Sequence, residues 1–232
     1  MEFLLNEPPS AELIRERHER LLERLRHAAE AGGHDPGRLR IVGVTKTHPA
    51  SLARAALTAG ITLLGESRVQ EAEPKIDAVP EAEWHFIGRL QSNKARRAVR
   101  HFAVIHSVDS LDLLDRLDAL AADGGMRPQV LLQVNISGEA SKAGMAPEAL
   151  SDVTGPRSIA LVGLMTIAPM GVSHEEARAV FARLRGLRDR LEQRIGFRLP
   201  ELSMGMSADA DAAAAEGATL VRIGTLLFGP RA

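Results

Sequence analysis

Short apolar runs alternate with amphipathic stretches along almost the whole chain. Eight of these runs are four to eight residues long, which is the length of strands buried in a parallel sheet. The predicted strands cover residues 40–46, 61–64, 83–87, 103–106, 129–135, 160–166, 200–203 and 219–223.

The stretches between these runs repeat their apolar residues at helical spacing. They predict helices over residues 51–59, 68–78, 93–99, 110–122, 147–155, 174–195 and 209–216. A longer amphipathic helix at about residues 10–31 precedes the first strand and ends at Gly32 and Gly33.

The alternation of strands and helices predicts an α/β fold built on a parallel sheet. Eight strands close a (β/α)8 TIM-type barrel, and this is the architecture that we expect. A doubly wound open sheet is the alternative, because it has the same alternation. No linker or break in composition divides the chain, so residues 1–232 are expected to form a single barrel domain with an extra N-terminal helix.

Composition narrows the classes of function. The chain has 232 residues, 45% of them hydrophobic, and a formal net charge of −1, which argues against nucleic acid or an anionic membrane as a partner. It has no cysteine, and its scattered histidines lack metal-ligand spacing, so we expect neither disulfides nor a metal. Neither a signal peptide nor a run long enough to span a membrane is apparent, which predicts a cytoplasmic protein.

Residues with chemical potential follow the predicted strands at their carboxyl ends, where barrels place their sites. The segment "SMGMSAD" after the seventh strand combines glycine, a hydroxyl group and a helix start, and "RIGT" places Gly224 and Thr225 just past the eighth. Free N–H groups at such positions favour an anion. Each segment alone is typical of a turn, but together they predict a phosphate site.

Lys46 ends the first predicted strand, which a closed barrel places beside the eighth. Arg222 lies near the end of that eighth strand, and a nearby cation lowers the proton affinity of a lysine, as a Schiff-base nucleophile requires. The alternative is that Lys46 only extends into water. A phosphorylated aldehyde such as pyridoxal 5′-phosphate (PLP) would explain both the lysine and the phosphate site.

Several segments closely resemble the PLP homeostasis protein family, from about residue 10 to the C-terminus. They read "VTKTHP", "GESRVQEA", "WHFIGRLQSNK", "QVNISGEASKAGM", "GLMTIAP" and "LSMGMSADADAAAAEGATLVRIGTLLFGPR". The resemblance implies a barrel like the N-terminal domain of alanine racemase, with Lys46 forming the Schiff base. It also implies that Ser207, Gly224 and Thr225 bind the phosphate and that Arg222 faces the pyridine nitrogen.

The chain departs from that family at three positions near the expected cofactor. Ser67 stands where the family usually has asparagine, Arg68 where an aromatic residue is common, and Arg89 where histidine is usual. We keep Ser67 among the expected cofactor-binding residues. His85, on the third strand, is expected to point into the barrel with Ile87, either as a partnered core histidine or as a catalytic one.

We expect a carrier that holds PLP and donates it to apo-enzymes rather than an efficient enzyme. An arginine at the ring nitrogen weakens the cofactor as an electron sink. The chain also has no tyrosine to act as a second base, and it ends soon after Thr225 without a second domain. The alternatives are a low-activity amino-acid racemase or lyase with Lys46 as single base, and a phosphate-binding barrel enzyme without PLP. With 3% aromatic residues, a monomer is expected.

Overall fold

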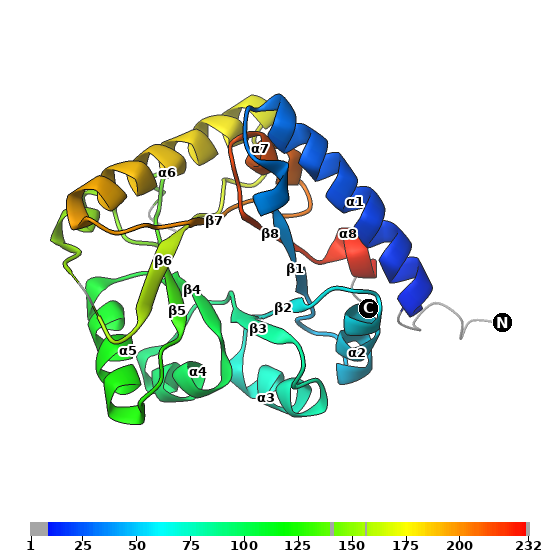
Figure 1. The fold of residues 1–232 in the computed structure, drawn as a ribbon, viewed down its shortest axis with the longest axis horizontal. Coiled ribbons are helices and arrows are strands. Elements are labelled where there is room, and N and C mark those ends of the chain that lie inside the picture. The colour runs from blue at the N-terminus through cyan, green and yellow to red at the C-terminus, as the bar shows by residue number, and fades with distance from the viewer. Residues whose placement is uncertain (1–8, 140–141, 156, 231–232) are drawn as a thin grey trace.

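The computed structural model describes residues 9–139, 142–155 and 157–230, and in these residues eight parallel strands close into a barrel in chain order (Figure 1). The strands are β1 (Arg40–Val44), β2 (Leu63–Glu66), β3 (Glu83–Phe86), β4 (Val104–Val108), β5 (Gln129–Gln133), β6 (Ala160–Met165), β7 (Glu201–Ser203) and β8 (Leu220–Ile223). The predicted α/β barrel is confirmed.

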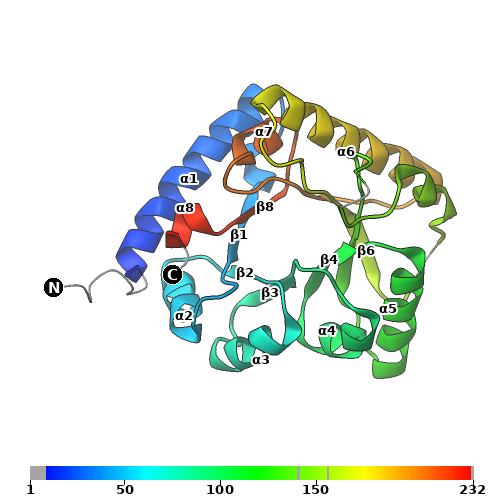
Figure 2. The ribbon, with the colours of Figure 1, turned by 180° about the vertical axis from the view of Figure 1, so that it is seen from behind.

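Helices surround the barrel on its outer side, as the two opposite views show (Figures 1 and 2). They are α1 (Ala11–Ala31), α2 (Ala50–Thr58), α3 (Val69–Ala78), α4 (Ala95–His101), α5 (Leu111–Gly124), α6 (His174–Ile195), α7 (Ala210–Ala215) and α8 (Thr225–Phe228), with 3₁₀ helices η1 (Pro36–Arg38), η2 (Ser92–Lys94) and η3 (Pro147–Asp152). None of the helices in the described ranges is long and apolar enough to cross a membrane.

The pairing of β1 with β8 decides between the barrel and the open sheet. Val42 lies opposite Arg222 and Gly43 opposite Ile223, in parallel register. The last strand of an open doubly wound sheet would not pair with the first in this way. The strand that precedes the predicted lysine and the strand that contains the predicted arginine are therefore neighbours, as barrel closure required.

The first strand ends earlier than the sequence predicted. We expected a strand to Lys46, but β1 ends at Val44. The N–H of His48 donates to the carbonyl of Thr45 at 3.1 Å, and Thr47 has a φ of 68°. The chain thus turns directly after the strand, because it must reverse toward helix α2 on the outside of the barrel. Lys46 lies in this turn and not on the strand.

Two other elements differ from the expectation. The second strand begins at Leu63 and extends to Glu66, because the N–H of Ile61 bonds to the carbonyl of Ala56 and belongs to the end of helix α2. The helix predicted over 147–155 is the 3₁₀ helix η3, which ends with the N–H of Val153 donating to Leu150 three residues back. Of the residues in η3, Leu150 alone is buried, so little apolar contact supports a longer α-helix.

The extra N-terminal helix packs on the last two helices of the chain. Its buried face consists of Ile14, Leu21, Leu25 and Ala29. The Arg17 side chain donates to the carbonyl of Leu227 in α8 at 3.0 Å. At the other end, a Cβ on Gly32 would lie 2.1 Å from the carbonyl oxygen of Ala215 in α7, so this approach requires glycine. Helix α1 is therefore packed into the layer of helices that surrounds the barrel.

Candidate functional site

The predicted site residues come from four adjacent strands. Lys46 follows β1, Ser67 follows β2, Ser207 lies in the turn after β7, and Arg222 is part of β8. The strand order β2, β1, β8, β7 is continuous around the barrel, and the strands are parallel. The fold therefore brings these residues to one sector of the carboxyl end, where barrel enzymes place their sites.

Arg222 is a buried cation with a fixed orientation. Its side chain donates from Nη1 to Ser203 Oγ at 2.6 Å and from Nη2 to the carbonyl of Thr166 at 2.9 Å, and the residue is 5% exposed. Burial lowers the pKa of Arg222 to about 10, and the Asp209 carboxylate opposes that shift. The guanidinium therefore remains charged at neutral pH while most of its hydration is removed.

A buried ion pair lies directly beside the lysine turn. Thr45 Oγ1 donates to Glu66 Oε1 at 2.6 Å, and Lys75 Nζ donates to the same oxygen at 2.6 Å. Lys75 Nζ also donates to the carbonyl of Thr45 at 2.8 Å. Thr45 is therefore held through its side chain and its backbone, and this fixes the start of the turn that carries Lys46. The other oxygen, Glu66 Oε2, has no hydrogen-bond partner among the described residues.

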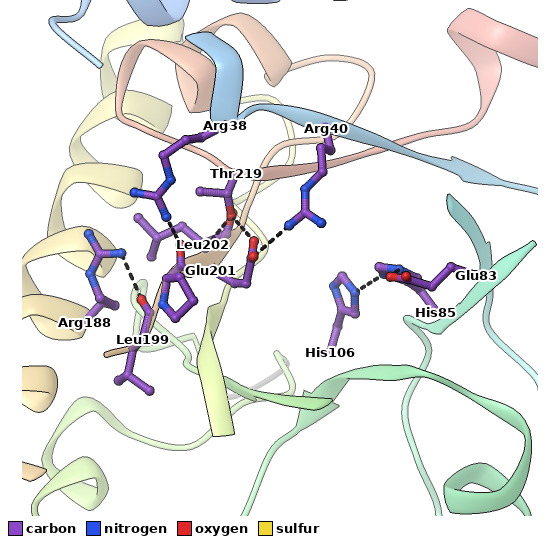
Figure 3. A network of polar contacts seen from close by, with 11 residues as sticks. Arg38, Arg40, Glu83, His85, His106, Arg188, Leu199, Glu201, Leu202 and Thr219 are labelled. Atoms are coloured by element: carbon purple, nitrogen blue, oxygen red, sulfur yellow. Dashed lines mark hydrogen bonds and ion pairs between the residues drawn. The ribbon is translucent and has the colours of Figure 1, made fainter. Parts of the chain in front are cut away.

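On the other side of the site, Arg222 connects to two histidines inside the barrel. Ser203 Oγ lies 2.7 Å from His106 Nδ1, and His106 Nε2 lies 2.8 Å from His85 Nδ1. His85 Nε2 lies 2.9 Å from Glu83 Oε1. Figure 3 shows the two rings side by side, with Glu83 next to His85. His85 is thus a partnered histidine in the barrel interior, while Trp84 and Phe86, its neighbours on β3, contact Val79 and Phe102 on the outer side.

The charge states of His106 and Glu83 follow from their surroundings. Burial first, then the charges of His85 and Arg222, hold the pKa of His106 well below its ordinary value. The hydrogen bond from His85 lowers the pKa of Glu83, against the effect of partial burial. At neutral pH the His106 ring is therefore neutral and Glu83 is ionised.

The predicted phosphate segments form two short loops at adjacent strand ends. Ser207 is half-buried in the turn before α7, Gly224 precedes the first turn of α8, and Thr225 is exposed at its start. Gly205 has a φ of 89°, and a Cβ there would lie 2.5 Å from the Cβ of Ala213, so the loop after β7 requires glycine. The loop is closed by Asp209, which accepts from the N–H of Met206 at 2.6 Å.

The donor set fits a phosphorylated aldehyde. A buried guanidinium and the half-buried Lys46 come from paired strands, and hydroxyl groups and loop N–H groups lie at the ends of β7 and β8. A lysine amine suits the aldehyde, and the two loops suit the phosphate. Within the described ranges, by contrast, no three histidine, aspartate or glutamate side chains gather as metal ligands would.

Sequence analysis missed four residues of this region. Glu66 was expected just after the second strand and Lys75 in the helix over 68–78, and His106 and Ser203 appeared to be ordinary strand residues. Polar residues inside otherwise apolar strands were the available signal, because a buried polar group needs a partner. The sequence does not say which partner.

Comparison with known proteins agrees with this geometry. The family profile described as alanine racemase, N-terminal domain, matches residues 19–232. A pyridoxal phosphate homeostasis protein of Aquifex aeolicus is 41% identical over 222 residues, which cover 93% of this chain and 97% of that protein. Another of the same name, from Pseudomonas aeruginosa, is 45% identical over 224 residues and covers 94% and 96%.

Solved structures extend the likeness to the fold. PipY of Synechococcus elongatus with PLP bound is 41% identical and superposes with a TM-score of 0.81 over 93% of this chain and 100% of that one. Its PLP-free structure gives 42% and 0.83 with the same coverage. Alanine racemase of Clostridium difficile, at 16% identity and a TM-score of 0.70 over 88% of this chain and 56% of that one, shares the fold alone. By sequence and structure together, the chain belongs to the pyridoxal phosphate homeostasis protein family.

Proposed function

We propose that this protein binds PLP as a Schiff base on Lys46 and takes part in cellular PLP homeostasis. The observation that supports the proposal is the pairing of β1, the strand before the Lys46 turn, with β8, which contains the buried and oriented Arg222. The PLP-bound structure of PipY, a relative at 41% identity, supports the choice of ligand. PLP would supply an aldehyde that bonds reversibly to an amine.

Each remaining site residue has a proposed role toward the cofactor. The loops that contain Ser207, Gly224 and Thr225 would hold the phosphate through hydroxyl and N–H donors. Arg222 would face the pyridine nitrogen and, because a guanidinium only donates, keep that nitrogen unprotonated. Ser67 would contact the cofactor from the end of β2, where its shorter side chain replaces the asparagine usual in the family.

A carrier role fits the openness of this region better than catalysis does. Lys46 and Ser207 are half-buried and Thr225 is exposed, so a second amine could approach the bond and release PLP. The chain has no tyrosine to act as an opposing base, and its aromatic content of 3% provides few interface anchors. We therefore propose a cytoplasmic monomer that donates PLP to apo-enzymes.

The Schiff base is tested by absorbance of the purified protein with PLP, before and after borohydride. The wild-type protein should show an imine band that borohydride converts to a stable adduct, and Lys46→Ala should lose both. Lys94→Ala, a lysine in η2, is the matched control and should keep both. Peptide mapping that places the reduced pyridoxyl group on another lysine would contradict the assignment.

The carrier role needs a separate test. The holo-protein is mixed with a PLP-free aminotransferase, and recovered activity is followed over time. Recovery should be faster than with free PLP at the concentration that the holo-protein releases alone, and Lys46→Ala loaded with PLP should give no such advantage. Equal rates, or turnover of a panel of amino acids by the protein itself, would favour a slow racemase or lyase instead.

A further inference from the structure

A line of hydrogen bonds crosses the barrel interior from Arg222 to the opposite end. It passes through Ser203, His106 and His85 to Glu83, and the strands that supply it are β8, β7, β4 and β3. The first four of these residues are at most 5% exposed, whereas the Glu83 side chain is 45% exposed. The line therefore joins a buried cation to a carboxylate that contacts solvent.

One assignment of protons satisfies every atom along this line. Ionised Glu83 can only accept, so a neutral His85 carries its proton on Nε2 and accepts at Nδ1. His106 must then donate from Nε2 and accept at Nδ1, and the acceptor at Nδ1 requires the hydroxyl of Ser203 to donate. Ser203 Oγ in turn accepts from Arg222, which can only donate. All donors point from Arg222 toward Glu83.

We propose that Ser203 and His106 are positioning residues for Arg222, and that Glu83, at the other end of the barrel, fixes which ring nitrogen of each histidine carries the proton. The inference concerns residues of the apo-protein, and only its effect on bound PLP rests on the proposed function. The polar residues inside the barrel then have a role of their own in the site, which is to orient Arg222.

Protonation of the histidine pair reverses the line. When His85 gains a second proton, its Nδ1 becomes a donor, so His106 must accept at Nε2 and carry its own proton on Nδ1. In balance, the pair gains one proton, which enters at the solvent-exposed Glu83 end: His85 then carries protons on both ring nitrogens, the single proton of His106 is on Nδ1 instead of Nε2, and Ser203 keeps its hydroxyl proton. Ser203 Oγ then receives N–H groups from both His106 and Arg222, and its anchoring of Arg222 is weakened.

Other charged groups bear on this equilibrium from the packed strands. Arg40 of β1 lies close enough to His106 to oppose its protonation, and it is itself paired with Glu201 of β7 at 2.7 Å (Figure 3). Arg222 of β8 opposes protonation from the other end, while Glu83 favours it. The carboxylate of Glu83 is therefore the group whose removal should most lower the proton affinity of the pair.

The proton assignment is tested in the apo-protein with ¹⁵N-labelled histidine. Long-range nitrogen–proton NMR correlations identify the protonated nitrogen of each ring. Near neutral pH, both His85 and His106 should carry the proton on Nε2. On acidification the His106 nitrogen signals should report the reversal of the line, and Glu83→Gln should move that change to lower pH. Glu81→Gln is the matched control. Glu81 lies just before β3, close in sequence to Glu83, but it pairs with Arg54 at the surface.

A proton on His106 Nδ1 near neutral pH would overturn the assignment. So would a change in the His106 nitrogen signals at the same pH in Glu83→Gln and Glu81→Gln. This readout does not depend on PLP, so it stands even if no borohydride adduct forms on Lys46. Failure of the proposed function and failure of this inference are therefore distinguishable.

The link to Arg222 is tested with PLP bound. The wild-type absorbance spectrum should change with pH over the range in which the His106 nitrogen signals change, and Glu83→Gln should shift both changes by the same amount. Ser203→Ala should abolish the change in absorbance while the His106 signals still respond to pH, and Ser203→Thr, which keeps a hydroxyl, should restore it. A spectrum that follows pH equally in Ser203→Ala and wild type would refute the positioning role.

Discussion

The two sides of the predicted site are held by two different kinds of buried polar contact. Beside Lys46, Glu66 and Lys75 form an ion pair in which one carboxylate oxygen accepts from both Lys75 and Thr45. Beside Arg222, the contacts continue through Ser203 into the histidine pair. The first arrangement is compact and charged at both partners, whereas the second is extended and passes through a neutral ring.

This difference has consequences for how each side responds to change. Two opposite charges that are buried away from water attract each other strongly. Removal of one therefore leaves the other as a buried charge without a counter-ion, which is costly. The line from Arg222 to Glu83 is charged only at its two ends, and the direction of the hydrogen bonds through its neutral middle depends on protonation. We therefore expect the lysine side of the site to be rigid and the arginine side to respond to pH.

The largest effect should come from breaking the ion pair. Lys75→Met should lower the free energy of unfolding of the apo-protein by about 3–5 kcal/mol, because it leaves the Glu66 carboxylate buried without its cation. Urea denaturation measures the loss. The double variant Glu66→Leu with Lys75→Met should recover most of it, because no buried charge then remains. A loss below about 1 kcal/mol in the single variant, as at exposed pairs, would contradict the rigid charged arrangement.

The arginine side should show itself as acid sensitivity. His106 has a lowered pKa in the folded state, so between that pKa and its ordinary value the unfolded chain binds more protons. This contribution to stability is present above the ordinary histidine pKa and is lost as pH falls toward the folded-state pKa. The slope is at most about 1.4 kcal/mol per pH unit for one group.

Urea denaturation at a series of pH values measures that slope. His106→Asn, whose side-chain amide can still contact Ser203 but does not titrate, should flatten the dependence in this window. The acid sensitivity of wild type and variant should differ by no more than the contribution of one proton. Parallel curves of unfolding free energy against pH for the two proteins would mean that His106 does not have a lowered pKa in the folded state.

The smallest effect should come from breaking an ion pair at the surface, which also joins a cation to a carboxylate. Arg68 and Glu71 approach to 2.6 Å, but their side chains are 71% and 35% exposed. Glu71→Gln should change the free energy of unfolding by about 0–1 kcal/mol, because water screens both charges. Measured beside Lys75→Met, this variant isolates burial as the cause of the larger effect. A comparable loss in both would show that burial is not the cause.

The fold was predictable because its signals are local. Helix α6 (His174–Ile195) has the predicted bounds, with Ser173 and Glu176 forming a capping box and Gly196 ending it at a φ of 76°. Repetition of such units eight times leads to a closed barrel. The errors, at Lys46, at the bounds of the second strand and in the 147–155 segment, occurred at the ends of elements and in connections between them.

The site was predictable only as far as strand order determines it. Barrel closure pairs β1, which precedes Lys46, with β8, which contains Arg222, because the first and last strands must meet. The contact of His106 with Ser203 spans 97 residues and crosses the interior, so it depends on the tilt and register of the strands, which alternation of apolar residues does not specify. The orientation of Arg222 depends on that contact and had to come from the structure.

The packing of α1 on α7 and α8 also constrains how the protein is made. Arg17 and its partner Leu227 are 210 residues apart, so at about 5–20 residues per second the ribosome needs roughly 10–40 s to deliver the partner. Helix α1 is amphipathic, and most of the stability of such a helix in a protein comes from the packing of its apolar face. During that interval α1 has α2 as a neighbour, through the bond from Arg15 to the carbonyl of Thr58, but it lacks α7 and α8. The newly made chain is thus most exposed to chaperones, proteases and aggregation at its beginning, until its end has been synthesised.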